Sequence, residues 1–322
     1  MTDPVGSLKL VFCGTPQFAV PTLEALIAAG HRLALVVTQP DRPVGRDHEL
    51  AAPPVKQTAL AAGLTVTQPE KIRSNAELRS QLEAIAPDAI VVVAYGRIIP
   101  PWMLALPRLG CINLHGSLLP KYRGAAPIQW AVAMGDAYTG NTTMLLEEGL
   151  DTGPILMQQT IEIDPRQTAA DLFPVLASAG APLVVETLAG LANGTIGPEP
   201  QNEEGATFAP LLDREDGRMN FAVRTARELH NRWRGFQPWP GAFTTLNGKK
   251  LIVHRMAVGE PANVTLEIAE PGRIVVEGQR ILAACAGNTW LELLEVQLEG
   301  KKRITATEFL HGNPLPAHAR LG

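Results

Sequence analysis

Hydrophobic positions in the first half of the chain fall into two alternating patterns. Segments of strand length that are rich in apolar and β-branched residues lie at 8–13, 33–37, 65–67, 89–94, 111–114 and 142–146. Helical spacing, with apolar residues every three or four positions, lies between them at 18–27, 55–62, 75–85 and 128–134. Strands that alternate with helices predict βαβ units and a mostly parallel sheet that is covered on both faces. The sequence therefore predicts an α/β protein that begins with a Rossmann-like domain.

The pattern changes in the last third of the chain. After a long Ala- and Leu-rich helix at 169–191, the segment 193–200 is dense in glycine and proline, which is typical of a linker. A helix at 221–233 then precedes short β-type runs at 243–246, 251–254, 272–276, 281–284 and 290–294. Turn signals such as Asn247-Gly248 separate these runs, and this spacing predicts a small OB-like β-barrel. We expect two domains, at 1–205 and 206–322.

Composition narrows the class of protein without changing this organisation. The 322 residues are 46% hydrophobic and 19% charged, with a net charge of -4, which excludes a chain that is disordered throughout. The longest uncharged apolar run in the first half, 89–96, is far shorter than the roughly 20 residues of a membrane-spanning helix. The first ten residues carry no recognisable signal or transit peptide. We therefore expect a cytoplasmic protein without a membrane span.

Nicotinamide dinucleotides and metal ions are not expected as ligands. A dinucleotide fingerprint needs three glycines in the turn after the first strand, and here Gly14 supplies only the first. Pro16 and Phe18 would also crowd the approach of a pyrophosphate. The three cysteines, at 13, 111 and 285, lack the paired spacing of a zinc site or a disulfide framework. We interpret them as small buried apolar residues.

Asn113 and His115 form the most informative pair of polar residues. They stand two positions apart at the end of a predicted strand, so their side chains share a face where ligands of open α/β sheets bind. A side-chain amide can donate to an oxygen that gains negative charge, and an imidazole can exchange a proton near neutral pH. Asp151 follows the predicted strand 142–146 in a glycine-flanked loop and could orient the ring. The three residues are candidates for an acyl-transfer site.

A purely structural interpretation of the same residues is also open. Asn113 could bond to backbone at the strand end, His115 could be a satisfied buried ring, and Asp151 could cap a turn. The spacing alone favours this second interpretation. The motifs that surround the three residues favour the functional interpretation instead.

These motifs resemble the family of formyltransferases that take their one-carbon unit from 10-formyltetrahydrofolate. The resemblance rests on the Asn113-x-His115 strand end, the Ser-Leu-Leu-Pro turn at 117–120 and the Leu-Asp-Thr-Gly loop at 150–153. Within the family, the methionyl-tRNA formyltransferase branch is similar along almost the whole chain. The matching segments are Phe-Cys-Gly-Thr-Pro at 12–16, Thr-Gln-Pro-Asp-Arg-Pro at 38–43, Val-Val-Val-Ala-Tyr-Gly at 91–96, Lys-Tyr-Arg-Gly-Ala-Ala-Pro-Ile at 121–128 and Pro-Trp-Pro-Gly-Ala at 238–242. Each segment alone is weak, but together and in order they are specific.

The resemblance implies a formyl transfer catalysed by the first domain, with 10-formyltetrahydrofolate as co-substrate and without a metal. The free α-amine of methionyl-initiator tRNA would attack the formyl carbon and give a tetrahedral intermediate. Asn113 and His115 would stabilise its negative oxygen, and Asp151 would hold His115 and assist proton transfer. The residues expected to contact folate are Ala94, Tyr95, Gly96, Arg97, Ser117, Leu118, Leu119 and Pro120.

The resemblance also implies two regions of contact with tRNA. The first is the loop at 39–50, in which Arg42 and Arg46 would contact the nucleic acid. The family usually continues from Arg46 with glycine and a lysine pair, whereas this chain has Asp-His-Glu at 47–49, which weakens the attraction to phosphate. The second region is the domain 206–322, in which a basic face is expected from Arg224, Arg227, Arg234, Lys249, Lys250, Lys301, Lys302 and Arg303. We expect a monomer.

Three other functions remain open at this point. A folate-dependent formyltransferase that acts on a UDP-aminosugar would share the main motifs and a small second domain. A hydrolase that removes the formyl group from the same folate would replace the amine with water. A catalytically silent folate-binding or RNA-binding module is the alternative from a different class, and the presence of Asn113, His115 and Asp151 together argues against it.

Overall fold

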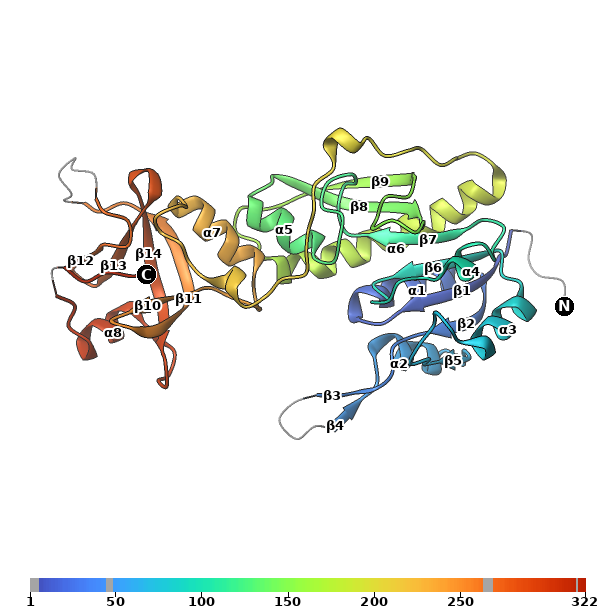
Figure 1. Ribbon diagram of the computed structural model, residues 1–322, viewed down its shortest axis with the longest axis horizontal. Coiled ribbons are helices and arrows are strands. Elements are labelled where there is room, and N and C mark those ends of the chain that lie inside the picture. Colours follow the sequence, from blue (N-terminus) through green and yellow to red (C-terminus); the bar gives the residue numbers. More distant parts are fainter. Residues whose placement is uncertain (1–5, 45–48, 263–268, 317) are drawn as a thin grey trace. The chain divides into compact units, whose positions relative to one another are not determined.

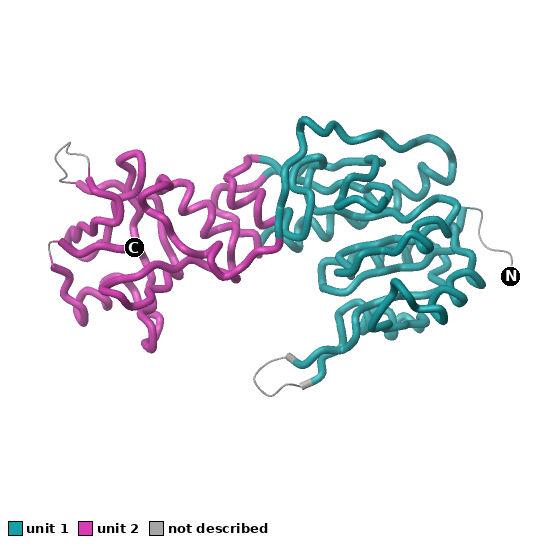
Figure 2. The backbone as a smooth tube through the Cα atoms, viewed as in Figure 1, with its two compact units in different colours: residues 1–127, 138–162, 171–210 teal, residues 128–137, 163–170, 211–322 magenta. Residues whose placement is uncertain are grey.

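The computed structural model describes residues 6–44, 49–262, 269–316 and 318–322. The chain divides into two compact units, which are coloured separately in Figure 2. The first unit comprises 1–127, 138–162 and 171–210, and the second comprises 128–137, 163–170 and 211–322. The assignment of catalysis to 1–205 and of tRNA binding to 206–322 stays a prediction.

A seven-stranded sheet forms the centre of the first unit, in the order β5-β2-β1-β6-β7-β8-β9 (Figure 1). The strands from β5 to β7 run parallel, whereas β8 and β9 are antiparallel to their neighbours. The predicted Rossmann-like, mostly parallel sheet is confirmed. The bounds are β1 (Lys9–Gly14), β2 (Arg32–Val37), β5 (Val66–Thr67), β6 (Ala89–Val93), β7 (Cys111–His115), β8 (Tyr138–Leu145) and β9 (Ile155–Glu162).

Helices cover both faces of this sheet because alternate strand residues point to opposite sides. Leu10 and Phe12 of β1 share one core with Leu23 and Val184, while Val11 shares the other core with helix residues such as Leu78. Helix α3 begins where the side chain of Asn75 accepts a hydrogen bond from the N–H of Leu78 at 2.9 Å. The helices of this unit are α1 (Val20–Ala28), α2 (Pro54–Ala61), α3 (Ala76–Ile85), α4 (Pro101–Leu104) and most of α6 (Ala169–Asn193).

Helix α6 is long and apolar enough to cross a membrane by length and composition. Half of its most apolar stretch is buried within the protein, and Leu183, Val184 and Leu188 pack into the core beside β1. We therefore interpret α6 as a core helix. Sequence patterns missed β9 because it is an edge strand whose middle residues are exposed, so that no apolar run marks it.

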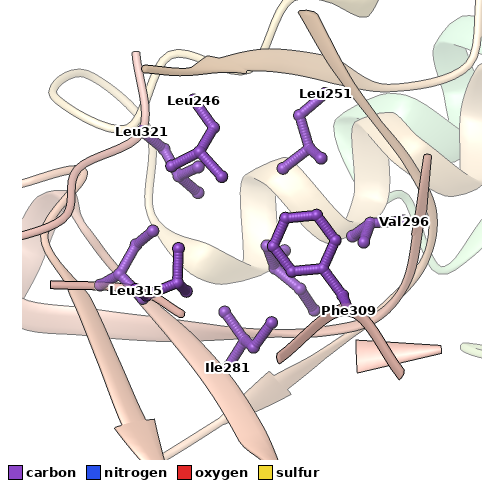
Figure 3. Close-up of a pocket in the computed structure, with 9 residues that line it drawn as sticks. Leu246, Leu251, Ile281, Val296, Phe309, Leu315 and Leu321 are labelled. Atoms are coloured by element: carbon purple, nitrogen blue, oxygen red, sulfur yellow. The ribbon is translucent and has the colours of Figure 1, made fainter. Parts of the chain in front are cut away.

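The second unit is built around a five-stranded antiparallel path in the order β10-β11-β14-β13-β12. The last residues of the chain close it, because Leu321 pairs with Leu246 beside β10 and Arg320 pairs with Arg273 beside β12. Figure 3 shows the apolar side chains that point into the barrel, among them Leu246, Phe309 and Leu321. The predicted small barrel is confirmed. The strands are β10 (Phe243–Leu246), β11 (Lys249–Gly259), β12 (Ile274–Glu277), β13 (Arg280–Cys285), β14 (Thr289–Leu298) and β15 (Ile304–Thr305), which pairs with β14.

Among its described residues, the second unit has the α-helices α5 (Pro127–Met134), α7 (Ala226–Gly235) and α8 (Ala306–Gly312). Helix α7 begins later than the predicted 221, because Thr225 and Glu228 form a capping box that starts the helix at Ala226. Helix α8 was not predicted because it is short, and its apolar contribution to the core is mainly Phe309.

Candidate functional site

The carboxyl end of β7 carries the two central candidates. Val92 of β6 pairs with Asn113, and Thr142 of β8 pairs with His115, so β7 is fixed on both sides. His115 is only 6% exposed, whereas Asn113 is half-buried. Within the part of the chain that the structure describes, the side-chain amide of Asn113 makes no hydrogen bond to another residue. The amide is therefore available as a donor to a ligand.

The two ring nitrogens of His115 face different groups. Nε2 lies 2.9 Å from the carbonyl oxygen of Tyr122, and Nδ1 lies 3.7 Å from Oδ2 of Asp151. A carbonyl oxygen can only accept, so Nε2 must carry a proton in this hydrogen bond. Nδ1 is therefore the nitrogen that can gain or lose a proton, and it faces a carboxylate. The structure thus brings His115 and Asp151 together as the sequence predicted.

Asp151 is held in place by a backbone hydrogen bond while it faces His115. Its Oδ2 accepts a hydrogen bond of 2.8 Å from the N–H of Gly124. The residue adopts a left-handed backbone conformation with φ 51°, which is uncommon for a residue other than glycine. Groups held in this way recur at functional sites, where the surrounding structure maintains them.

Arg123 is a neighbour of the site that was not among the predicted site residues, although it lies in the matching segment 121–128. It is 2% exposed, and its guanidinium donates to Gln201 and to both carboxylate oxygens of Glu203. The hydrogen bonds from Arg123 lower the pKa of Glu203, and the same pairing raises the pKa of Arg123. Gln201 and Glu203 lie just beyond the predicted linker, so only a three-dimensional arrangement could reveal this contact.

The expected folate residues at the end of β6 form a tight turn. Ala94 and Gly96 have positive φ angles of 45° and 79° and are exposed, while Tyr95 between them is buried. The carbonyl oxygen of Tyr95 accepts hydrogen bonds of 3.1 Å from Gln39 and from Thr15. Gln39 also accepts from Nε of Arg97 at 3.1 Å. Gln39, which was not predicted, therefore fixes this turn.

The second expected folate segment, Ser117 to Pro120, is pinned to β8. Thr142 donates to the carbonyl of Ser117 at 2.6 Å and accepts from the N–H of Leu119 at 3.1 Å. Gln158 of β9 donates to the carbonyl of Leu119 at 2.8 Å. Both segments thus have a fixed backbone at the same edge of the sheet, and their contact with folate stays a prediction.

Arg42, the first candidate tRNA residue of the first unit, lies in a strand of a hairpin. Residues expected to form a loop pair as β3 (Arg42–Val44) and β4 (Glu49–Ala51), which extend away from β2 and β5 in Figure 1. Arg42 is exposed, whereas Arg46 and residues 47 and 48 lie outside the described residues. Asp41 at the base of the hairpin forms an ion pair of 2.7 Å with Lys56.

One expected basic residue of the second unit is not on its surface. Arg234 is 4% exposed, and its Nη1 donates to the carbonyl oxygen of Gln167 at 2.8 Å. Its inclusion in a basic face was therefore wrong, because the side chain is used to tie α7 to the segment that contains Gln167. Lys301 and Lys302 are exposed, as expected.

Comparison with known families decides which proteins this arrangement belongs to. Residues 8–188 match the family described as formyl transferase, and residues 211–314 match the formyl transferase C-terminal domain. The chain belongs to the formyl transferase family. The family predicted from the motifs is thereby confirmed.

The relatives of this formyl transferase match it over nearly its whole length. A protein of Acidobacterium capsulatum named methionyl-tRNA formyltransferase is 65% identical over 315 residues, which cover 98% of this chain and 100% of that protein. A protein of Koribacter versatilis with the same name is 57% identical and covers 94% of this chain and 95% of its own.

A solved structure shares the fold. It is the N-formyltransferase from Helicobacter canadensis in complex with folinic acid and dTDP-3-aminofucose, with a TM-score of 0.62 and 19% identity. The match covers 89% of this formyl transferase and 98% of that chain. At this identity the likeness concerns the fold alone.

Proposed function

We propose that this formyl transferase moves the formyl group of 10-formyltetrahydrofolate to the free α-amine of methionyl-initiator tRNA. The observation that carries the proposal is the 65% identity, over the full length of the relative, to a protein named methionyl-tRNA formyltransferase. The arrangement of Asn113, His115 and Asp151 at the carboxyl end of β7 supports it independently, because an amide donor and a proton-exchanging ring stand together there.

The proposed reaction forms one carbon–nitrogen bond and breaks another. The amine attacks the formyl carbon, whose oxygen becomes negative until the bond from that carbon to the folate nitrogen breaks. The amine loses one proton and the departing folate nitrogen gains one. The side-chain N–H of Asn113 donates to this oxygen while it is negative. A fixed donor accelerates acyl transfer most at this stage.

His115 and Asp151 supply the proton exchange in this proposal. Because Nε2 of His115 is committed to the carbonyl of Tyr122, the exchange takes place at Nδ1. The Asp151 carboxylate lies 3.7 Å from Nδ1, within reach of the proton that is exchanged there. Asp151 thereby faces the nitrogen at which His115 exchanges the proton.

Folate binding is proposed for the two fixed segments at the strand ends. The exposed backbone at Ala94 and Gly96 can pair with polar edges of a heteroaromatic ring, and Tyr95 and Arg97 are held in place by Gln39. The turn at 117–120 would cover the other side of the site.

Binding of tRNA is proposed to rest on charge from both units. In the first unit we propose Arg42 and Arg46, and in the second the lysines at 249, 250, 301 and 302. Lys249, Lys301 and Lys302 are exposed, which suits contact with RNA phosphates. Such contacts predict binding that weakens as salt rises.

We further propose that the enzyme is monomeric and that it acts in the cytoplasm, where its tRNA acceptor is used in protein synthesis. Gel filtration with light scattering tests the first statement. A mass near 34.5 kDa is expected, and a mass near twice that value would contradict it.

A transfer assay with radiolabelled formyl-folate tests the proposed function. It is run with charged initiator tRNA, with a UDP-aminosugar and with no acceptor. Formylation of the tRNA alone is expected. Label in the aminosugar would identify a sugar N-formyltransferase, formate release without an acceptor would identify a hydrolase, and no turnover in any arm would contradict an enzymatic role.

A further inference from the structure

Residues 199–209, named the strap below, lie against the loops that carry the partners of His115. Glu199 and Ile155 exchange two backbone hydrogen bonds of 2.8 Å. Further along, the N–H of Arg123 donates to the carbonyl of Thr207 and the N–H of Ala209 donates to the carbonyl of Arg123, both at 2.8 Å. The segment that leads in sequence from the first unit toward the second is therefore paired with the first unit on both sides of the site.

Gln201 of the strap holds the backbone of the Asp151 loop. Its Nε2 donates to the carbonyl oxygens of Asp151 at 2.8 Å and of Gly153 at 2.7 Å. Its Oε1 accepts from Nε and Nη2 of Arg123 at 3.0 and 2.9 Å. Since Asp151 has the unfavourable φ of 51°, these two bonds oppose its relaxation to an ordinary conformation.

Arg123 and Glu203 complete the arrangement. Nη1 and Nη2 of Arg123 each donate to one carboxylate oxygen of Glu203 at 2.9 Å, which is the bidentate geometry that gives both strength and orientation. Arg123 is buried while Glu203 is 73% exposed. The exposed carboxylate of Glu203 thus balances the charge of the buried Arg123 guanidinium.

The strap also holds the second partner of His115. The N–H of Tyr122, a residue with φ 63°, donates to Oγ1 of Thr207 at 2.9 Å. The carbonyl oxygen of the same Tyr122 accepts from Nε2 of His115. Both groups that face the His115 ring, the Tyr122 carbonyl and the Asp151 carboxylate, are therefore fixed by contacts with the strap.

We propose that Gln201 and Arg123 are positioning residues of formyl transfer, which hold Asp151 and the Tyr122 carbonyl against His115 by linking them to the strap. This inference rests on the proposed function, since it assigns a role in that reaction. Neither side chain needs to touch a substrate. The strap is then a part of the catalytic site and not only a connection.

Two substitutions test the proposal through the split between kcat and KM. Gln201→Glu keeps the size and the acceptor for Arg123 but removes the donor to the two carbonyl oxygens. We expect kcat to fall about 10- to 100-fold, because small misplacements of reacting groups have effects of this size. The KM values for folate and for tRNA should stay within about twofold, since no substrate contact is removed.

Glu203→Gln is the milder variant and has a matched control. It removes the charge that faces Arg123, and we expect kcat to fall about fivefold, as for one weakened charged hydrogen bond. Glu204→Gln makes the same charge change at the next residue, which is exposed and whose side chain makes no hydrogen bond within the described parts of the chain. It should leave kcat unchanged.

Melting curves accompany both variants. If Gln201→Glu does not fold, Glu203→Gln decides alone, because it alters a largely exposed carboxylate. The proposal is overturned if folded variants keep the kcat of Glu204→Gln, or if their loss lies in KM with kcat intact. A parent protein that formylates no tRNA would instead contradict the proposed function, so the two failures are distinguishable.

Discussion

The groups proposed for chemistry and those proposed for tRNA binding are held in opposite ways. His115 and Arg123 are buried and meet their partners at fixed distances, whereas Arg42, Lys301 and Lys302 are exposed on the surface. Formyl transfer depends on the placement of atoms to a fraction of an ångström, but attraction to phosphate needs only positive charge nearby. Substitutions in the first region should therefore lower kcat at any salt concentration. Substitutions in the second region should raise the KM for tRNA and change its dependence on salt.

The largest effect is expected from loss of the groups at the end of β7. Asn113→Ala and His115→Ala should each lower kcat about 100- to 1000-fold, the range measured for removal of one oxyanion donor. Initial-rate formylation assays at low and high salt check this, and the ratio to the parent protein should not depend on salt. His311→Ala, which changes an exposed histidine of the second unit, is the control and should be without effect.

A smaller loss is expected from displacement of the strap. Gly124 has φ 123°, and a Cβ atom there would lie 2.6 Å from the carbonyl oxygen of Ala209. Gly124→Ala should push the strap away, release the N–H that holds Asp151 and lower kcat about 10- to 100-fold. Gly197→Ala adds the same methyl where nothing lies within 4 Å, so its rate and melting temperature should equal those of the parent. Equal rates for both variants would remove the role of the strap.

Arg42→Ala should affect tRNA binding and not the chemical step. We expect the KM for tRNA to rise about three- to tenfold with kcat little changed, because one phosphate contact is lost. The slope of log affinity against log salt should become shallower by about one. Filter binding across a salt series measures both. A fall in kcat with an unchanged slope would place Arg42 in the chemistry instead.

The smallest effect is expected from the second unit. Lys301→Gln and Lys302→Gln together should raise the KM for tRNA about two- to fourfold and reduce the salt slope, since exposed lysines contribute charge without fixed geometry. Thr307→Val, on neighbouring α8, keeps the charge and should leave both quantities unchanged. An unaltered salt slope in the lysine variant would exclude these residues from the tRNA contact.

Much of the first unit could be predicted from sequence because its buried strands and helices have distinct periods. Runs such as 89–94 have no polar residue, and α3 begins at a recognisable Asn75 cap. The motif at Asn113 and His115 could be found because both residues lie on one strand. Their meeting with Asp151 could not be read from strand order, because β8 is antiparallel to β7 and ends beside the start of β7, so that only the loop after β8 brings Asp151 to His115.

The remainder could not be predicted because it depends on contacts between distant segments. The strap begins at the end of the glycine- and proline-rich segment 193–200, and its hydrogen bonds to Arg123 and Asp151 follow from the fold and not from any sequence pattern. Arg234 looked like a surface cation, and only the position of α7 beside Gln167 shows that it is buried. Strand β9 escaped notice because an edge strand with exposed residues carries no apolar signal.

Asp151→Asn gives the most direct test of the central claim that a carboxylate facing Nδ1 of His115 supports formyl transfer. The amide keeps the shape and an acceptor for the N–H of Gly124 but removes the negative charge 3.7 Å from the ring. Single-turnover rates with prebound folate and tRNA should fall at least about 100-fold while both affinities stay within about twofold. A single-turnover rate close to that of the parent protein would contradict the account.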